Sequence, residues 1–202
     1  MKILVLYYSM YGNVFKLAQA VAEGAKKVEG SEVSLKTVPE LVAEDIIEKS
    51  PGAKKAKEQQ EDIPVATLDD LGDADGVIFG SPTRFGNMCA QLRQFLDQTG
   101  ELWQKGALIG KPAGFFCSTS TVHGGQETTL VSMMLTAIHH GMLVVGIPYS
   151  EQRLLTTKGG GSPYGASSVS GMMSDQLPTE DDLELAFALG KRVAEIAKKL
   201  KS

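Results

Sequence analysis

Short runs of apolar residues recur along the chain and predict buried β-strands. The runs cover residues 3–8, 76–80, 113–117 and 142–145. Each run is too short for a helix, and continuous apolar runs are typical of strands that are buried on both faces. Residues 33–38 alternate instead between polar and apolar positions, as a strand exposed on one face does. The pattern therefore predicts five strands, of which residues 33–38 form an outer one.

Segments with the apolar spacing of α-helices follow several of these runs. The apolar positions at helical spacing are Leu17, Val21, Ala25 and Val28, then Leu92, Phe95 and Leu96, then Val131, Leu135 and Ile138. A last helix is predicted after Thr179, its N-cap, with an acidic first turn and a basic C-terminus. Its expected buried face runs through Leu183, Phe187, Val193, Ile196 and Leu200. Strands that alternate with helices predict a doubly wound α/β domain, whose parallel sheet is covered on both faces.

Two stretches exceed the minimal five-strand unit. Residues 39–64 are polar and rich in Lys and Glu, with a short amphipathic piece near residues 41–47, and residues 147–178 are rich in Gly, Ser and Tyr. Loops of this length are uncommon unless they are functional or pack against a partner. We therefore expect one domain over residues 1–202, with an insert at about 39–64 and a Gly-rich excursion at about 147–178.

Composition and charge exclude several classes of protein. The chain has 202 residues, a net charge of −4 and no basic cluster interleaved with aromatic residues, so we expect no nucleic-acid partner. No apolar run reaches the roughly 18 residues of a membrane-spanning helix, so we expect no integral membrane segment. Cys89 and Cys117 stand alone, without the spacing of metal ligands or of a disulfide framework. This usage favours no metal site and a reducing, cytoplasmic location.

The turn after the first strand has the composition of an anion site. Ser9, Met10, Tyr11, Gly12, Asn13 and Val14 join this strand directly to a helix, whose first N–H groups have no helical partner. Hydrogen bonds to a charged group contribute about 1.5–3 kcal/mol each, against about 0.3–1 kcal/mol for a helix dipole. Because the turn lacks Lys, Arg and G-x-G-x-x-G spacing, a terminal monophosphate fits better than a triphosphate or a pyrophosphate. The alternative is an ordinary capped turn between a strand and a helix.

Two further loops should lie beside this turn. Residues 81–88 and 118–127 follow the third and fourth strands, and open α/β sheets bind ligands at the carboxyl ends of their strands. Small residues in these loops allow close approach to a planar heterocycle, with Phe85 and Trp103 as candidate walls. Taken alone, such an aromatic is more often a core or surface residue than a stacking platform. His139 and His140 precede Gly141, a predicted helix C-cap. One possibility is that both residues simply belong to the last turn of a helix. The other is that one of the two imidazoles donates a hydrogen bond to the ligand.

Several motifs carry a resemblance to a known family. They are YYSMYGN, FGSPTRFGNM, Trp103 after LDQTGELW, HGGQETT, HHGM and GGGSPYGAS, and they extend over nearly the whole chain. Together they resemble the WrbA family of flavodoxin-like NAD(P)H:quinone oxidoreductases, with departures at Ser120 and at Val122 and His123. The resemblance implies a flavodoxin-like sheet of five parallel strands in the order 2-1-3-4-5, helices on both faces, and a homotetramer. The insert and the Gly-rich excursion would then be assembly surfaces.

The resemblance also implies FMN as cofactor, with NADH or NADPH as co-substrate. By motif, the turn from Ser9 to Val14 would hold the phosphate. The flavin ring would contact Pro82, Thr83, Arg84, Phe85, Gly86, Ser118, Thr119, Ser120, Thr121, Val122, His123, Gly124 and His140. The nicotinamide nucleotide and the quinone would contact Tyr11, Phe85 and Trp103, and His140 is the one candidate for a catalytic role.

The implied activity is the two-electron reduction of quinones in a ping-pong order. Hydride would pass through flavin N5, and hydroquinone would form without a free semiquinone. Two alternatives remain open on the residues alone. One is a flavodoxin-type single-electron carrier, and the other is a phosphate-binding regulatory module on the same kind of sheet.

Overall fold

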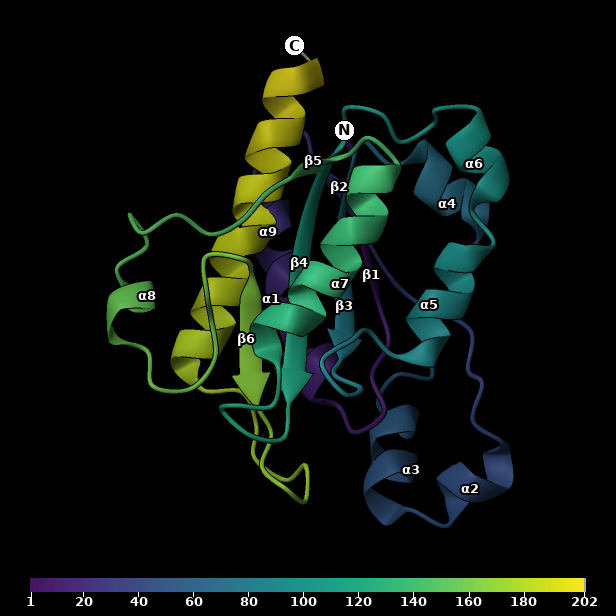
Figure 1. Ribbon diagram of the computed structural model, residues 1–202, viewed down its shortest axis with the longest axis vertical. Helices are drawn as coiled ribbons and strands as arrows, with labels where there is room; N and C mark the ends of the chain where they lie inside the picture. Colours follow the sequence, from purple (N-terminus) through teal and green to yellow (C-terminus); the bar gives the residue numbers. More distant parts are fainter. Residues whose placement is uncertain (202) are drawn as a thin grey trace.

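The computed structural model describes residues 1–201 and confirms the parallel α/β sheet (Figure 1). The strands are β1 (Lys2–Tyr7), β2 (Glu32–Thr37), β3 (Gly76–Pro82), β4 (Pro112–Thr119), β5 (Leu143–Val144) and β6 (Ala166–Val169). Their order is β2-β1-β3-β4-β5, and the pairings between neighbours are parallel. The flavodoxin-like order 2-1-3-4-5 is therefore confirmed, with β6 as an addition that the sequence did not predict.

Two short strands share the last position of the sheet. β5 pairs with the start of β4 at Pro112 and Ala113, whereas β6 pairs with its carboxyl end from Phe116 to Thr119. Since β3 occupies the other edge of β4, β5 and β6 lie along the same edge. The Gly-rich excursion thus interrupts one edge strand and brings the chain back beside the carboxyl end of β4.

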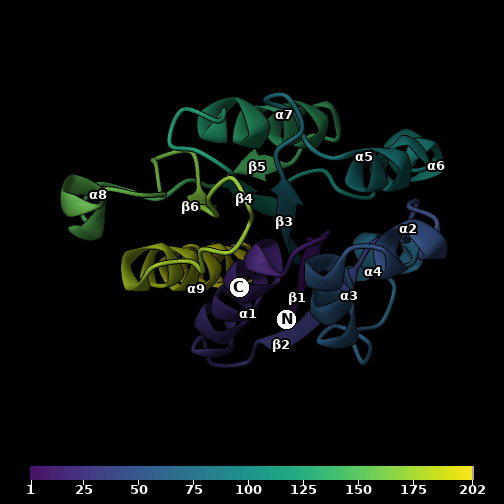
Figure 2. The same ribbon diagram turned by 90° about the horizontal axis from the view of Figure 1, so that it is seen from below.

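Helices cover both faces of the sheet. They are α1 (Asn13–Lys26), α2 (Glu44–Glu48), α3 (Pro51–Glu58), α4 (Leu68–Asp73), α5 (Ala90–Asp97), α6 (Gly100–Gln104), α7 (Gln126–His139), α8 (Arg153–Thr156) and α9 (Glu180–Lys201). Seen end-on, α1 and α9 lie below the sheet, and α5 and α7 lie above it (Figure 2). Two buried apolar clusters correspond to these two faces. The insert helices α2 and α3 lie at the end of the sheet where the strand arrows point (Figure 1).

Helices α1 and α9 approach each other closely because two glycines face the opposite backbone. A Cβ atom on Gly24 would lie 1.9 Å from the carbonyl oxygen of Phe187, and one on Gly190 would lie 1.9 Å from that of Val21. No side chain fits in either place. This packing fixes the axis of α1, whose N-terminus begins at the predicted phosphate turn.

The predicted N-cap of α9 is confirmed, but its buried face is displaced. The backbone N–H of Asp182 donates to the Thr179 hydroxyl at 3.2 Å, and the Thr179 N–H donates to the Asp182 carboxylate at 2.9 Å. The helix buries Leu185 and Leu189 as well as the predicted Val193, whereas the predicted Leu200 is 56% exposed. Small residues between these positions let α9 lie close to α1, which rotates the buried face away from the one that the large residues suggest.

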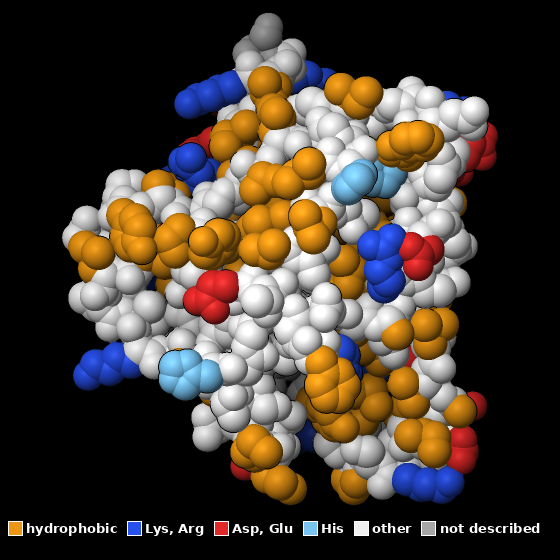
Figure 3. Space-filling view, viewed as in Figure 1, with side chains coloured by type: hydrophobic (Ala, Val, Ile, Leu, Met, Phe, Trp, Pro, Cys, Tyr) orange, Lys and Arg blue, Asp and Glu red, His pale blue; other side chains and the backbone are white. Residues whose placement is uncertain are grey.

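Helix α7 carries apolar residues on both of its sides. Leu130, Met133, Met134 and Ala137 are buried against the sheet. The predicted positions Leu135 and Ile138 are 56% and 57% exposed, on the outer side of the helix. Figure 3 shows hydrophobic side chains gathered in a band across this face of the molecule. One chain alone therefore leaves an apolar surface on α7 open to solvent.

Candidate functional site

The carboxyl ends of β1, β3 and β4 surround a pocket of about 270 Å³. Its lining residues are Ser9, Met10, Tyr11, Asn13, Val14, Pro82, Thr83, Arg84, Ser118, Thr119, Ser120, Ser170 and Ser174. The structure thus brings together the three loops that the sequence singled out. Tyr11, one of the predicted substrate contacts, stands at this pocket and is partly exposed.

The turn between β1 and α1 has the geometry of an anion site. Gly12 adopts a left-handed conformation, with φ at +92°, which a residue with a side chain rarely takes. Its N–H donates to the Ser9 hydroxyl at 3.2 Å, and α1 begins at the next residue. The first N–H groups of α1 have no partner within the helix, so they are free to bind a ligand in the pocket.

Asn13 supplies a buried polar side chain that has no partner of its own. The residue is 5% exposed and lines the pocket, and within residues 1–201 its Oδ1 atom receives no hydrogen bond. A half-turn of the amide group exchanges this oxygen for an NH₂ donor. The turn therefore offers uncharged donors from the backbone, from Ser9 and from Asn13, which fit a phosphate monoester.

The loops after β3 and β4 pack against each other and form the opposite wall. The Thr83 hydroxyl accepts a hydrogen bond from the Gly86 N–H at 3.2 Å and lies 2.9 Å from the Thr129 hydroxyl. A Cβ atom on Gly125 would lie 3.0 Å from the Cα of Gly86, so the two backbones nearly touch. The Thr83 N–H donates to the carbonyl of Ser118 at 2.9 Å. Hydrogen bonds and close backbone packing between the two loops fix this wall, so it can orient a flat ligand.

Phe85 is held in an unusual conformation next to Arg84, although Phe85 itself does not line the pocket. Arg84 and Asn87 exchange two backbone hydrogen bonds, and the residues between them, Phe85 and Gly86, have φ values of +52° and +77°. Two central residues with positive φ are typical of a type I′ turn. A left-handed residue with a side chain costs about 1–2 kcal/mol, and the Phe85 side chain is fully exposed. The turn thus displays an aromatic ring beside Arg84, the one charged residue among the described pocket-lining residues.

Part of the predicted loop after β4 does not line the pocket. Thr121, Val122 and His123 are exposed. Gly124 closes the loop, because its N–H donates to the carbonyl of Thr121 at 2.9 Å. These residues shape the loop, whereas Ser118, Thr119 and Ser120 face the pocket.

His140 lies at the opposite end of α7 from the pocket. The helix has 14 residues, and at 1.5 Å per residue it separates its two ends by about 20 Å. The Thr99 hydroxyl donates to the carbonyl of Leu96 at 2.7 Å, so His140 Nε2, 2.8 Å away, must donate to Thr99. Burial, together with the neighbouring His139, lowers the pKa of His140, which favours the neutral ring. Its buried Nδ1 has no partner within residues 1–201.

Trp103 accompanies His140 and is likewise not at the pocket of its own chain. Its indole N–H donates to the carbonyl of His139 at 3.0 Å, and its side chain is 60% exposed. A shallow cavity is lined by Trp103, His140, Thr99 and Arg93, among others. One chain therefore keeps the two predicted residues together but apart from the residues of the turn.

Two of the residues that line the pocket were not predicted from the sequence. Ser170 and Ser174 line the pocket and belong to the returning end of the Gly-rich excursion. The Ser170 N–H donates to the carbonyl of Thr119 at 2.8 Å, just past the last residue of β6. Because β6 consists of four mostly small residues, ASSV, no apolar pattern indicates that this segment joins the sheet.

Within residues 1–201 no group of three or more His, Cys, Asp or Glu residues is placed to hold a metal ion. None of the helices over the same residues combines the length and the apolar character that crossing a membrane requires.

Comparison with known proteins places the chain among flavin-dependent oxidoreductases. Residues 1–151 match the family of NADPH-dependent FMN reductases. A protein of Geotalea daltonii named NAD(P)H dehydrogenase (quinone) is 54% identical, over 99% of this chain and 98% of that protein. A protein of the same name from Solidesulfovibrio magneticus is 50% identical over the full length of both.

Solved structures agree with this placement. A flavodoxin, WrbA-like protein from Agrobacterium tumefaciens has a TM-score of 0.64 at 26% identity, with 98% of each chain covered. An archaeal flavodoxin has the same TM-score at 21% identity, which supports the fold alone. The resemblance seen in the sequence motifs is thereby confirmed, and the chain belongs to the NADPH-dependent FMN reductase family, among the relatives named NAD(P)H dehydrogenase (quinone).

Proposed function

We propose that this protein is an FMN-dependent enzyme that reduces quinones with NADH or NADPH, and that the turn of residues 9–14 holds the FMN phosphate. The observation that carries the proposal is the set of uncharged donors at the start of α1, with the unpartnered Asn13 amide among them. When bound, FMN accepts a hydride from the nicotinamide nucleotide and passes two electrons to the quinone. The protein supplies binding, orientation and electrostatics.

Each wall of the pocket has a separate task in this proposal. Ser9, Asn13 and the first N–H groups of α1 bind the phosphate by charge-assisted hydrogen bonds. The loops at Thr83 and Ser118, held to each other, orient the flat ring. The guanidinium of Arg84 donates to the carbonyl of Thr83 at 2.8 Å and would supply a positive charge at the pocket wall that stabilises negative charge on a reduced ring.

We further propose that the two substrates use one place in alternation. Tyr11 lines the pocket, and Phe85 directly follows Arg84, which also lines it. Both aromatic side chains are exposed and can cover the face of a nicotinamide or of a quinone ring. One such place requires the oxidised nucleotide to leave before the quinone enters, which is a ping-pong order. Steady-state rates at several fixed quinone concentrations then give parallel double-reciprocal lines against NADH, whereas intersecting lines contradict a shared place.

We also propose that the enzyme works as a homotetramer. Trp103 and His140 lie away from the pocket of their own chain, so a second copy is needed to bring them to a substrate bound there. The exposed apolar positions on α7 and the exposed β5 residues offer a surface for such contacts (Figure 3). Light scattering at micromolar concentration is expected to give four times the chain mass. A monomer with full activity would contradict this proposal.

The chain favours an enzyme over a small electron carrier. A carrier that docks its partners by charge uses a strongly acidic face, whereas this chain has a net charge of only −4. Both cysteines are free and buried, which agrees with our proposal that the enzyme works in the reducing cytoplasm.

The test of the proposed function compares FMN with riboflavin. The flavin-free protein is titrated with each compound, and bound flavin is followed by the quenching of its fluorescence. FMN is expected to bind at least tenfold more tightly than riboflavin, because the phosphate makes charge-assisted hydrogen bonds of about 1.5–3 kcal/mol each. The FMN-loaded protein is then mixed with NADH and benzoquinone. Equal affinity for both flavins, or the absence of quinone turnover, would refute the proposal.

A further inference from the structure

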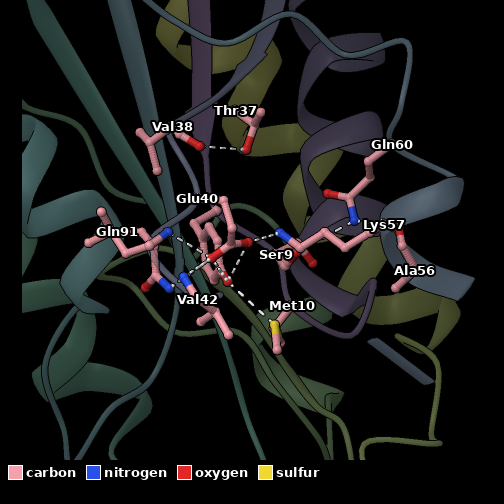
Figure 4. Close-up of polar contacts among 12 residues, drawn as sticks. Ser9, Met10, Thr37, Val38, Glu40, Val42, Ala56, Lys57, Gln60 and Gln91 are labelled. Carbon is pink, nitrogen blue, oxygen red and sulfur yellow. Dashed lines mark hydrogen bonds and ion pairs between the residues drawn. The ribbon is translucent and has the colours of Figure 1, made fainter. Parts of the chain in front are cut away.

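The carboxylate of Glu40 is the centre of a partly buried polar cluster beside the phosphate turn (Figure 4). It accepts hydrogen bonds from the Val42 N–H at 2.9 Å and from the Gln91 amide at 3.2 Å. The ammonium group of Lys57 lies 2.6 Å from its Oε2 atom. The Tyr8 hydroxyl lies 2.9 and 3.0 Å from its two oxygens. One carboxylate thus joins the chain just after β1, the insert at both of its ends, and α5.

Lys57 closes the cluster from helix α3. Its ammonium group pairs with Glu40 and also lies 4.3 Å from the centre of the Tyr8 ring, a cation–π distance. The side chains of Lys57 and Glu40 are only 25% and 28% exposed, so water screens this pair less than a surface ion pair. Burial raises the pKa of Glu40, but the hydrogen bonds from Lys57, Val42 and Tyr8 outweigh it and hold the pKa below its usual value.

Helix α3 lies directly behind the phosphate turn. A Cβ atom on Gly12 would lie 3.6 Å from the Cβ of Ala56, so the helix passes close to the turn there. The Gln60 amide, which follows α3, donates to the carbonyl of Ala56 at 2.6 Å and lies 3.5 Å from that of Ser9. Ala53 and Ala56 are buried, and their small size allows this close approach.

The position of Tyr8 makes the cluster part of the turn. Tyr8 directly precedes Ser9, and its hydroxyl also lies 3.4 Å from the Sδ atom of Met10, which lines the pocket. The cluster is therefore connected to the residues on both sides of Ser9. The pocket lining includes none of the cluster residues Tyr8, Glu40, Lys57 and Gln91, nor the neighbouring Gln60.

We propose that residues 39–64 are a docked element, and that the contact between Lys57, Glu40 and Tyr8 holds the turn of residues 9–12 in its phosphate-binding form. This inference rests on the proposed function, since it assumes that the turn binds FMN. Lys57, Glu40 and Tyr8 are positioning residues, because they act on the cofactor through the turn. If the insert is docked for only a fraction of the time, the apparent dissociation constant for the ligand equals the intrinsic one divided by that fraction. By linkage, bound FMN must in turn stabilise the docked insert.

The first test measures the affinity for FMN in three single variants. Lys57→Met removes the ammonium group and keeps the length of the side chain, and Tyr8→Phe removes only the hydroxyl group within a buried ring. Lys54→Met is the matched control, because Lys54 lies on the same helix but pairs with Glu48, and both of these side chains are about half exposed. A fall of the docked fraction to one tenth raises the dissociation constant about tenfold. We expect this change for Lys57→Met, about threefold for Tyr8→Phe, and less than twofold for Lys54→Met.

The second test follows amide hydrogen exchange in residues 51–60 with and without FMN. In the unaltered protein FMN is expected to slow exchange in this segment at least threefold, although the segment does not line the pocket. In Lys57→Met exchange is faster without FMN, and the slowing by FMN is larger, because the cofactor then restores docking. A merely structural Lys57 would lower the melting temperature without changing the effect of FMN on this segment.

The outcomes separate this inference from the proposed function. If the unaltered protein binds no FMN, the proposed function fails. If it binds FMN while exchange in residues 51–60 stays the same, or if Lys57→Met and Lys54→Met bind FMN equally well, the docked element is refuted and the proposed function stands.

Discussion

Ser9→Ala is expected to weaken FMN binding strongly while leaving the fold intact. The substitution removes one oxygen atom from a side chain that is 1% exposed. That oxygen accepts the Gly12 N–H at 3.2 Å and lines the pocket where the phosphate is proposed to bind. A hydrogen bond to a charged group contributes about 1.5–3 kcal/mol, which corresponds to a roughly 10- to 100-fold change in the dissociation constant. The Gly12 N–H also loses its acceptor, which loosens the turn further.

The assay is a fluorescence titration of the flavin-free protein with FMN. Ser31→Ala is the matched control, because the Ser31 hydroxyl is buried without a partner within residues 1–201 and lies beyond the opposite end of α1. The control is expected to bind FMN as the unaltered protein does. Riboflavin provides a second control, since Ser9→Ala should change its affinity much less than that of FMN. A change of less than twofold for FMN, or an equal loss for both flavins, would show that Ser9 does not bind the phosphate.

Three further predictions concern the wall of the pocket, acid stability and helix packing. Thr83→Val removes the hydroxyl that accepts the Gly86 N–H. It is expected to weaken FMN binding and to lower the free energy of unfolding in urea by about 1–3 kcal/mol. Thr83→Ser keeps the hydroxyl and should therefore retain both the FMN affinity and the stability. Because the folded state lowers the pKa of Glu40 from 4.5, its ionised form stabilises the fold above that pH, and this contribution disappears as the pH falls below it. In Glu40→Gln the free energy of unfolding should therefore fall less steeply below pH 4.5 than in the unaltered protein. In Glu29→Gln, at a side chain that is 95% exposed, it should fall as steeply as in the unaltered protein. The Cβ atom of Gly190→Ala would lie 1.9 Å from the carbonyl oxygen of Val21, so this variant is expected to lower the free energy of unfolding by about 1–3 kcal/mol. A Cβ atom on Gly100 would meet no atom within 4 Å, so Gly100→Ala is expected to leave the free energy of unfolding unchanged.

The sheet could be predicted from the sequence because its central strands are buried on both faces. Continuous apolar runs at 3–8, 76–80 and 113–117 correspond closely to β1, β3 and β4. The strand β6 could not be predicted, because its residues are small and polar and its pairing with β4 is fixed by tertiary contacts. The same holds for the inner face of α9, where glycine and alanine determine how closely the helix approaches α1.

The candidate site was partly predictable for a similar reason. The carboxyl ends of neighbouring parallel strands meet at one edge, so the loops after β1, β3 and β4 had to converge there. Ser170 and Ser174 reach the pocket only through the unpredicted pairing of β6. Trp103 and His140, which the sequence also assigned to the site, lie instead at a separate cavity with Thr99 and Arg93. The cluster around Glu40 joins residues distant in sequence, from Tyr8 to Gln91, and no spacing in the chain indicates it.

A crystal structure of the protein grown with FMN tests the central claim most directly. The account predicts that the phosphate lies within hydrogen-bond distance, about 2.7–3.2 Å, of the Ser9 hydroxyl and of backbone N–H groups at the start of α1. It also predicts that the Asn13 amide, unpartnered in the chain alone, turns its NH₂ group to a phosphate oxygen. Bound flavin whose phosphate lies elsewhere, for example against Arg84 with the turn of residues 9–14 empty, would contradict the account.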